Sequence, residues 1–237
     1  MTKALENNEF QINAEKIKNF LTLCKLRVNS LIVFTAVIGM FLSTPGMVPW
    51  DILLSGILGI GFVAAAAAAF NCLIEESIDK KMARTRARPL GTGKINQQET
   101  LVLASIVGLI GLAVLFFFVN FLTMWLTLIT FFAYAAIYTV FLKPATPMNI
   151  VIGGASGAMP PVLGWAAVNN QLSPEAWILF LIIFCWTPPH FWALALYRRE
   201  EYAKVGIPML PVTHGEKFTL LHIILYTIIL AIVTLMP

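Results

Sequence analysis

The chain has 237 residues, of which 59% are hydrophobic and only 12% are charged, and its formal net charge is +4 at pH 7. Soluble domains contain roughly 25% charged residues, so this composition excludes an ordinary soluble protein and indicates an integral membrane protein. The three cysteines show neither metal-ligand spacing nor the density of a disulfide framework. The apolar stretches are about 20 residues long and do not alternate with period two, which favours helices over barrel strands.

The first part of the chain is polar and mixed in charge. We expect residues 1–13 to be a disordered tail, and the sequence shows no apolar region typical of a signal peptide. Residues 14–28 place apolar and basic positions on different sides, which predicts an amphipathic helix at the membrane surface. Seven spans are then expected, at about 29–45, 50–73, 101–118, 122–142, 149–168, 175–197 and 218–236. The fold class is therefore all-α, a polytopic transmembrane bundle with one domain over 1–237.

The basic residues indicate the orientation of the bundle. All sixteen Lys and Arg lie in the N-terminal segment, in 74–98, in 143–148 or in 198–217, and the alternate connections carry none. By the positive-inside rule these four segments and the N-terminus are cytoplasmic. We expect an intramembrane cavity that opens to this side. Membrane lipid should surround the bundle, and no nucleic-acid partner is expected.

Carboxylates stand at the cytoplasmic end of the second expected span. Asn71, Glu75 and Asp79 are four residues apart, so on a helix they form one polar stripe. Five basic residues follow between 80 and 88. Carboxylate oxygens suit Mg²⁺, and basic side chains suit phosphate oxygens, so the pattern predicts a site for a Mg²⁺-diphosphate. The alternative is a helix end whose charges lie in water near anionic headgroups.

The turn between the fourth and fifth spans contains one base, Lys143. Asn149 opens the next helix, whose N-terminal dipole favours anions. Both residues are candidates for phosphate binding, and the alternative for Lys143 is a lone cytoplasmic anchor. The fifth span is rich in small residues from Gly153 onward and is interrupted by Pro160 and Pro161. These features fit close helix packing, or room for a bulky flat ligand beside the helix.

A further set of candidates lies near the end of the sixth span. His190, Tyr197 and Glu201 share one helix face, and Glu201 would be an inward-facing carboxylate. Pro188 and Pro189 are expected to kink the helix and open its backbone. An ionisable residue within a span is a functional candidate; the alternative for His190 is a packed histidine bonded to a carbonyl. Because both long loops begin with acidic residues, a parallel duplication would place them across one cavity.

Several motifs are similar to those of known families. Asn71-x3-Glu75-x3-Asp79 resembles the Asn-x3-Asp-x3-Asp motif of the intramembrane UbiA-type aromatic prenyltransferases. More narrowly, the chain resembles the haem O synthases (protohaem IX farnesyltransferases) over most of its length, from about Cys24 to Pro211. The stretches that carry this likeness are Ile78 to Leu90, Asn149 to Gly154, Pro160-Pro161, Gly164-Trp165, Trp186 to Trp192 and Gly206 to Val212.

The sequence departs from these families at three points. Glu75 stands where Asp is usual, which keeps the charge but adds a methylene. Pro144 follows Lys143 where an Arg is common, so one phosphate contact is missing. The families are generally drawn with nine spans, and seven are expected here.

The resemblance implies a Mg²⁺-dependent transfer of a farnesyl group from farnesyl diphosphate to a vinyl group of haem B, with addition of water, giving haem O. The implied metal ligands are Asn71, Glu75, Asp79 and Glu201. Phosphate contacts are implied for Lys143, Arg84 and Arg88, and a phosphate or haem propionate contact for Arg27. His190 would contact haem or handle a proton. The implied catalytic set is Asn71, Glu75, Asp79, Lys143 and His190, with further substrate contacts from Asn149 and Tyr197.

The resemblance also implies a bacterial cytoplasmic (inner) membrane protein with a functional link to haem-copper oxidase assembly. One alternative is a UbiA-type enzyme that prenylates a quinone-precursor ring at the same diphosphate site; the motifs around Gly153 and His190 argue against it. Another is a non-enzymatic haem-binding membrane protein, in which the acidic and basic loop only binds headgroups. This second alternative predicts no Mg²⁺-dependent turnover of farnesyl diphosphate.

Overall fold

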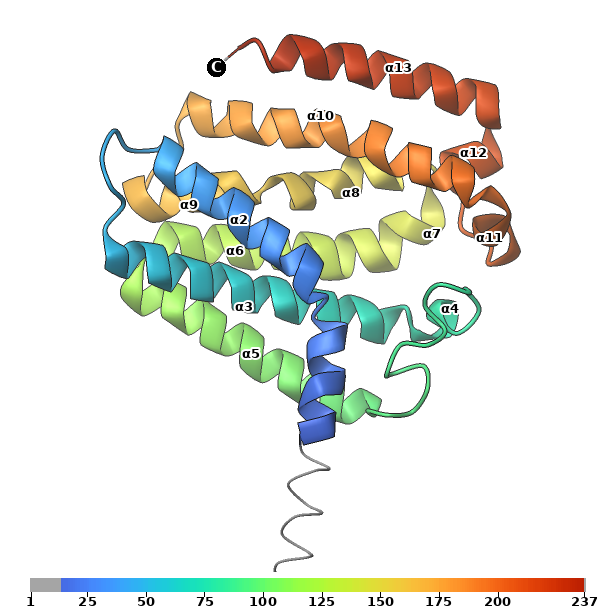
Figure 1. Ribbon diagram of the computed structural model, residues 1–237, viewed down its shortest axis with the longest axis horizontal. Helices are drawn as coiled ribbons and strands as arrows, with labels where there is room; N and C mark the ends of the chain where they lie inside the picture. Colours follow the sequence, from blue (N-terminus) through green and yellow to red (C-terminus); the bar gives the residue numbers. More distant parts are fainter. Residues whose placement is uncertain (1–13, 237) are drawn as a thin grey trace, which may run out of the picture.

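The computed structural model describes residues 14–236, and the tail expected over 1–13 lies outside them. Every regular element within this range is a helix, and the long helices lie side by side along one direction (Figure 1). Large apolar side chains such as Leu31 and Phe117 are exposed on the outside of the bundle, as expected where lipid rather than water is the solvent. The prediction of an all-α transmembrane bundle is confirmed.

Six helical segments between residues 14 and 236 are long and apolar enough to cross a membrane. They are α3 (Trp50–Ile74), α5 (Gln97–Phe118), the run Phe121–Ala145, the run Asn149–Asn169, α10 (Pro174–Tyr197) and α13 (Glu216–Val233). A seventh results when the helix Ala14–Leu23 and α2 (Leu26–Leu42), which meet at a bend of 58°, are counted as one span.

The surface helix expected over 14–28 differs from the helix in the structure. It ends at Leu23, and α2 begins at Leu26. Between them Lys25 has a φ of 49°, in the left-handed region that costs an L side chain energy. Leu23 and Cys24 are both buried in a cluster that includes Cys72 of α3. Burial of these two apolar side chains against α3 therefore fixes the bend.

Two of the membrane-spanning runs are irregular helices. The run Phe121–Ala145 consists of α6 (Phe121–Phe132), the π-helix η1 (Ala133–Leu142) and the single turn α7 (Lys143–Ala145). The run Asn149–Asn169 divides into α8 (Asn149–Ala158) and α9 (Pro160–Asn169), because Pro160 and Pro161 have no N–H to continue the helical ladder. In α10, by contrast, Pro188 and Pro189 lie inside one continuous helix.

Close packing of α2 on α9 depends on two glycines. A methyl group at Gly39 would collide with the backbone carbonyl of Pro161, and one at Gly164 would collide with the carbonyl of Ala36. Small residues at such a crossing let two helix backbones approach within contact distance. This crossing places α2 over α9 and α3 (Figure 1). Lys25, at the bend just before α2, contacts Asn71 in the last turn of α3.

The short helices gather at one end of the bundle. Figure 1 shows α4 (Glu76–Asp79), α7, α11 (Arg199–Lys204) and α12 (Leu210–Thr213) together at this end. Met82, from the loop after α4, is buried in one cluster with Tyr202, Ile207 and Leu210. The two long polar loops therefore pack against each other at this end of the bundle, where the sequence predicts them across one cavity.

Candidate active site

The polar stripe lies at the end of α3, where the short helices gather. Asn71 is in the last turn of α3, Glu75 lies at the break before α4, and Asp79 is the last residue of α4. All three side chains are buried, with exposed fractions of 3%, 6% and 4%. Burying two carboxylates is costly unless each is paired with a charge, so their partners define the site.

Each member of the stripe is bonded to a cation from a different segment. The ammonium of Lys25 donates to Asn71 Oδ1 at 2.8 Å. Lys143, at the end of η1, donates to Glu75 Oε1. Arg88 forms an ion pair with Asp79 through Oδ2.

The π-helix contributes a further contact to the stripe. Asn71 Nδ2 donates to the hydroxyl of Thr139 at 3.2 Å. That hydroxyl in turn donates to the carbonyl of Tyr134, five residues earlier, at 2.9 Å. The wider turn of a π-helix is frequent at functional sites, and here it carries both Thr139 and Lys143 toward the stripe. Asn71 is thus held on both sides of its amide.

The loop after α4 is tied down around Arg88. The hydroxyl of Thr85, which is buried, donates to the backbone carbonyl of Asp79 at 3.0 Å. Glu76 at the start of α4 accepts from Lys80 and from Gln97 of α5, and these hydrogen bonds hold the pKa of Glu76 below its ordinary value. The loop is thereby anchored at both ends, which limits the positions that Arg88 can take.

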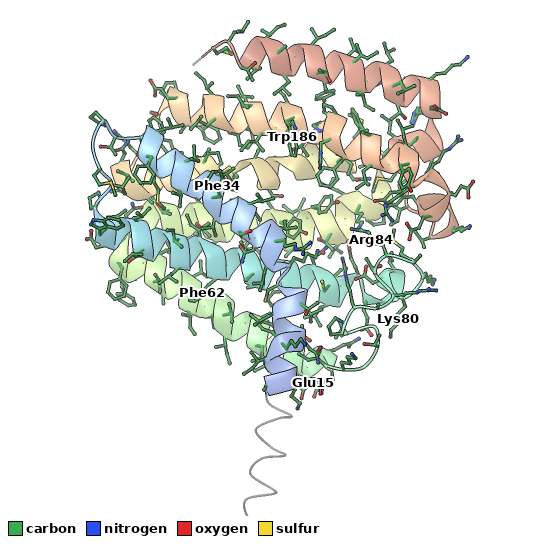
Figure 2. All side chains as sticks on the ribbon, viewed as in Figure 1. Glu15, Phe34, Phe62, Lys80, Arg84 and Trp186 are labelled. Carbon is green, nitrogen blue, oxygen red and sulfur yellow. The ribbon has the colours of Figure 1, made fainter. Side chains whose placement is uncertain are left out.

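Glu201 joins the second long loop to the first. Its carboxylate accepts from the backbone N–H of Arg84 at 3.4 Å and from the guanidinium of Arg198 at 3.0 Å. Partial burial raises the pKa of Glu201, but these hydrogen bonds outweigh burial and hold it below its ordinary value. Burial raises the pKa of the neighbouring Tyr202. Figure 2 shows Arg84 and Lys80 at this end of the bundle.

Four residues expected to contact substrate lie apart from the stripe. Tyr197 is 86% exposed at the end of α10, and Arg27 is exposed at the start of α2. Asn149 is fully buried and donates to the carbonyl of Thr146 at 2.6 Å, so its amide closes a local turn. Its Oδ1 has no hydrogen-bond partner among the described residues. Arg84 reaches the site region through its backbone contact with Glu201.

His190 is part of an exposed aromatic pair on α10. Its ring stacks on Trp186, with 4.3 Å between ring centroids and an interplanar angle of 20°. Trp186 is 46% exposed and projects from the middle of α10 (Figure 2). His190 is exposed rather than packed in the core, so the alternative of a buried histidine bonded to a carbonyl is wrong.

The oxygen donors of the stripe suit a hard divalent cation. Asn71, Glu75 and Asp79 offer one amide and two carboxylates, the ligand types that Mg²⁺ and Ca²⁺ prefer. Over residues 14–236 no group of three or more His, Cys, Asp and Glu side chains is close enough to hold a metal. Glu201, the fourth predicted ligand, is bonded to Arg84 and Arg198 instead. The four predicted ligands are therefore not assembled in this conformation.

The sequence analysis missed Lys25 and Thr139. Lys25 falls within the amphipathic surface helix expected over 14–28, and helical periodicity gives no sign of the left-handed turn that directs it to Asn71. Thr139 stands in an apolar run, and its only signal is that a hydroxyl interrupts that run four residues before Lys143.

Comparison with known proteins agrees with the family resemblance seen in the sequence motifs. The family described as the UbiA prenyltransferase family matches residues 32–237. A protoheme IX farnesyltransferase of Thiobacillus denitrificans is 64% identical over 98% of this chain and 78% of its own. One of Nitrosospira multiformis is 66% identical over 96% of this chain and 76% of its own.

Solved structures with the same fold are more distant in sequence. A structure described as that of a digeranylgeranylglyceryl phosphate synthase has a TM-score of 0.76 at 22% identity, over 92% of this chain and 76% of its own. A UbiA homolog from Archaeoglobus fulgidus, bound to GPP and Mg²⁺, has a TM-score of 0.73 at 17% identity, over 91% of this chain and 76% of its own. At these identities the likeness concerns the fold.

Proposed function

The chain belongs to the UbiA prenyltransferase family, and we propose that it transfers a farnesyl group from farnesyl diphosphate to a vinyl group of haem B. The product is haem O. The observation that carries the prenyl-transfer chemistry is the buried stripe of Asn71, Glu75 and Asp79 with a cation at each member. The assignment of haem B as the acceptor is supported by relatives that are 64% and 66% identical and are called protoheme IX farnesyltransferases.

The cations of the site can stabilise the diphosphate leaving group. When the bond between farnesyl carbon and oxygen breaks, negative charge grows on the diphosphate that leaves. Donors already aimed at that charge lower the barrier, because they need no reorganisation during the reaction. Lys143 and Arg88 are such donors: they stand within one cluster and are largely withdrawn from water. Charge-assisted hydrogen bonds of this kind are roughly twice as strong as neutral ones.

The metal ligands in this proposal are Asn71, Glu75 and Asp79, and the metal is Mg²⁺. A bound divalent cation neutralises phosphate charge and so makes diphosphate a better leaving group. The buried position of the stripe keeps its oxygens away from bulk water. Glu201 is a possible fourth ligand only if it exchanges its bond with Arg198, so we assign it to holding the two loops together.

The acceptor side of the site is assigned to the aromatic pair on α10. Trp186 and His190 present nearly parallel rings, and both residues are exposed. A porphyrin is a large flat aromatic surface, and stacked aromatic pairs are favourable beyond the area that they bury. His190 is thus proposed to contact haem. The apolar helices around the reaction also keep water from the allylic cation until the vinyl carbon attacks it.

The protein is an integral membrane protein, and we assign it to the bacterial cytoplasmic membrane with the end that contains α4, α7, α11 and α12 inside. The concentration of Lys and Arg in the segments at this end supports the orientation. Farnesyl diphosphate would then enter from the cytoplasm. Haem O would be delivered to the assembly of a haem-copper oxidase.

The test is a reconstitution. Purified protein in detergent is incubated with haem B, farnesyl diphosphate and Mg²⁺. The haems are then separated by chromatography and their masses are determined by mass spectrometry. The expected product carries one farnesyl group and one hydroxyl group more than haem B, because the addition of water to the vinyl carbon releases a proton. Prenylation of a quinone-precursor ring in place of haem would assign the chain to another acceptor class. Haem binding without any Mg²⁺-dependent loss of farnesyl diphosphate would make it a haem-binding protein rather than an enzyme.

A further inference from the structure

Each member of the stripe is bonded to one cation through one oxygen in this structure. The bonded atoms are Asn71 Oδ1, Glu75 Oε1 and Asp79 Oδ2, which are oxygens that a metal ion would need. The groups bonded to them are those that a diphosphate would need. A metal ion and these cations therefore compete for the same oxygens, and phosphate and these oxygens compete for the same cations.

This competition makes either ligand alone a poor fit. Metal binding without diphosphate would displace cations into a cluster with no anion to receive them. Diphosphate without metal would take the cations and leave buried carboxylates unpaired, which is strongly unfavourable. When both ligands bind, the carboxylates face the metal and the cations face phosphate, so every buried charge keeps an opposite charge.

Lys25 has the position of a third phosphate-binding cation. Its backbone is held in the left-handed region, with a φ of 49° and a ψ of 55°. Residues kept in this costly conformation by their surroundings are often parts of functional sites. Leu23 on one side is buried, and its carbonyl accepts from the thiol of Cys72, the neighbour of Asn71. The fold therefore directs this ammonium to the stripe at the expense of backbone strain.

Lys25 also has open space beside it. An open hollow of about 450 Å³ at the bend is lined by Lys18, Lys25 and Arg27 together with Thr22 and apolar residues. Its ammonium can thus leave Asn71 without entering a packed core. Lys18 and Arg27 would attract an anion to the same place.

We propose that Lys25 is a further diphosphate-binding residue, and that Lys25, Lys143 and Arg88 occupy the metal ligands until metal and diphosphate bind together. Each ligand then raises the affinity of the other by the same factor, because binding linkage is reciprocal. This inference rests on the proposed prenyl-transfer function and adds to it an order of events at the diphosphate site.

The test measures binding rather than turnover. Mg²⁺ is titrated by calorimetry into the intact purified protein, with and without inorganic diphosphate, and the free Mg²⁺ concentration is controlled with a metal buffer. Inorganic diphosphate should tighten Mg²⁺ binding by at least about tenfold. Equal Mg²⁺ affinity in both conditions would overturn the proposal, even if every variant below failed to fold.

Variants of the cations should change the affinities for Mg²⁺ and for diphosphate in predicted directions. Lys143→Met removes the competitor at Glu75, so it should tighten Mg²⁺ binding in the absence of diphosphate while it weakens diphosphate binding about tenfold or more. Lys25→Met should weaken diphosphate binding with a smaller effect on Mg²⁺ alone, because Asn71 is neutral. Lys80→Met is the matched control, since its ammonium pairs with the carboxylate of Glu76 outside the stripe.

Two results would contradict these assignments. Unchanged diphosphate affinity in Lys25→Met would remove Lys25 from the site. Weaker or unchanged Mg²⁺ binding in Lys143→Met would end the competition model. Failure to make haem O with the coupling intact would concern only the acceptor in the proposed function, so the two failures can be distinguished.

Discussion

Lys143 donates a hydrogen bond to the buried carboxylate of Glu75, and this contact joins the end of the π-helix η1 to the break between α3 and α4. The exposed fractions of the two side chains are 16% and 7%. The pair connects the run Phe121–Ala145 to α3 at the point where the candidate metal ligands lie. Its integrity should therefore affect both stability and ligand binding.

Glu75→Gln should destabilise the protein, because it leaves the Lys143 ammonium buried without its counter-charge. Breaking one side of a buried pair costs roughly 3 kcal/mol, and thermal unfolding in detergent measures the change. Adding Lys143→Met should restore part of the lost stability. Glu76→Gln is the control, since its pair with Lys80 is more exposed. Equal melting temperatures for Glu75→Gln and the parent would mean that the pair contributes nothing.

Trp186→Ala should weaken haem binding and leave the affinity for farnesyl diphosphate unchanged. An aromatic stacking contact is worth about 0.5–1.5 kcal/mol beyond buried area, which corresponds to roughly 2- to 13-fold in affinity. His190→Ala should affect the same substrate. Absorbance titration with haem B measures this, and Trp177→Ala near the other end of α10 is the control. A loss of farnesyl diphosphate affinity in either variant would contradict the division of the site.

Gly164→Ala should separate α2 from α9, because its methyl group has no space beside the carbonyl of Ala36. Overpacking of this kind typically costs about 1–3 kcal/mol. Gly157→Ala is a matched control in the same run, since nothing lies within 4 Å of the added methyl group. Thermal unfolding compares the two. A Gly164→Ala protein as stable as Gly157→Ala would show that the crossing adjusts easily.

Single cysteines introduced at Lys94 and Lys217 should react with a membrane-impermeant thiol reagent from the cytoplasmic side, and one at Gln171 from the other side. All three positions are exposed, whereas the three native cysteines are buried. The native cysteines are first replaced by serine or alanine. Labelling of Lys94 and Lys217 from opposite sides would be incompatible with the packing of the two long loops.

Local sequence patterns were sufficient for the helical class and for the stripe. Apolar stretches of membrane length leave the backbone no other way to satisfy its hydrogen bonds than a helix. The spacing of four residues predicts Asn71, Glu75 and Asp79 on one helix face, and all three are buried at or just beyond the end of α3. Pro160 and Pro161 predicted the break before α9 for an equally local reason, the missing N–H.

Only the tertiary structure decided which cation meets which oxygen. Lys25 reaches Asn71 because burial of Leu23 and Cys24 forces a left-handed turn, and no local pattern predicts that turn. Tyr197 and Asn149, which the sequence predicts as substrate contacts, lie apart from the stripe for the converse reason. A helical phase and a helix N-terminus fix a direction, but packing decides whether that direction leads to the site, to solvent or into a local turn. Pairing of buried charges is a property of three-dimensional proximity, which spacing along one helix does not contain.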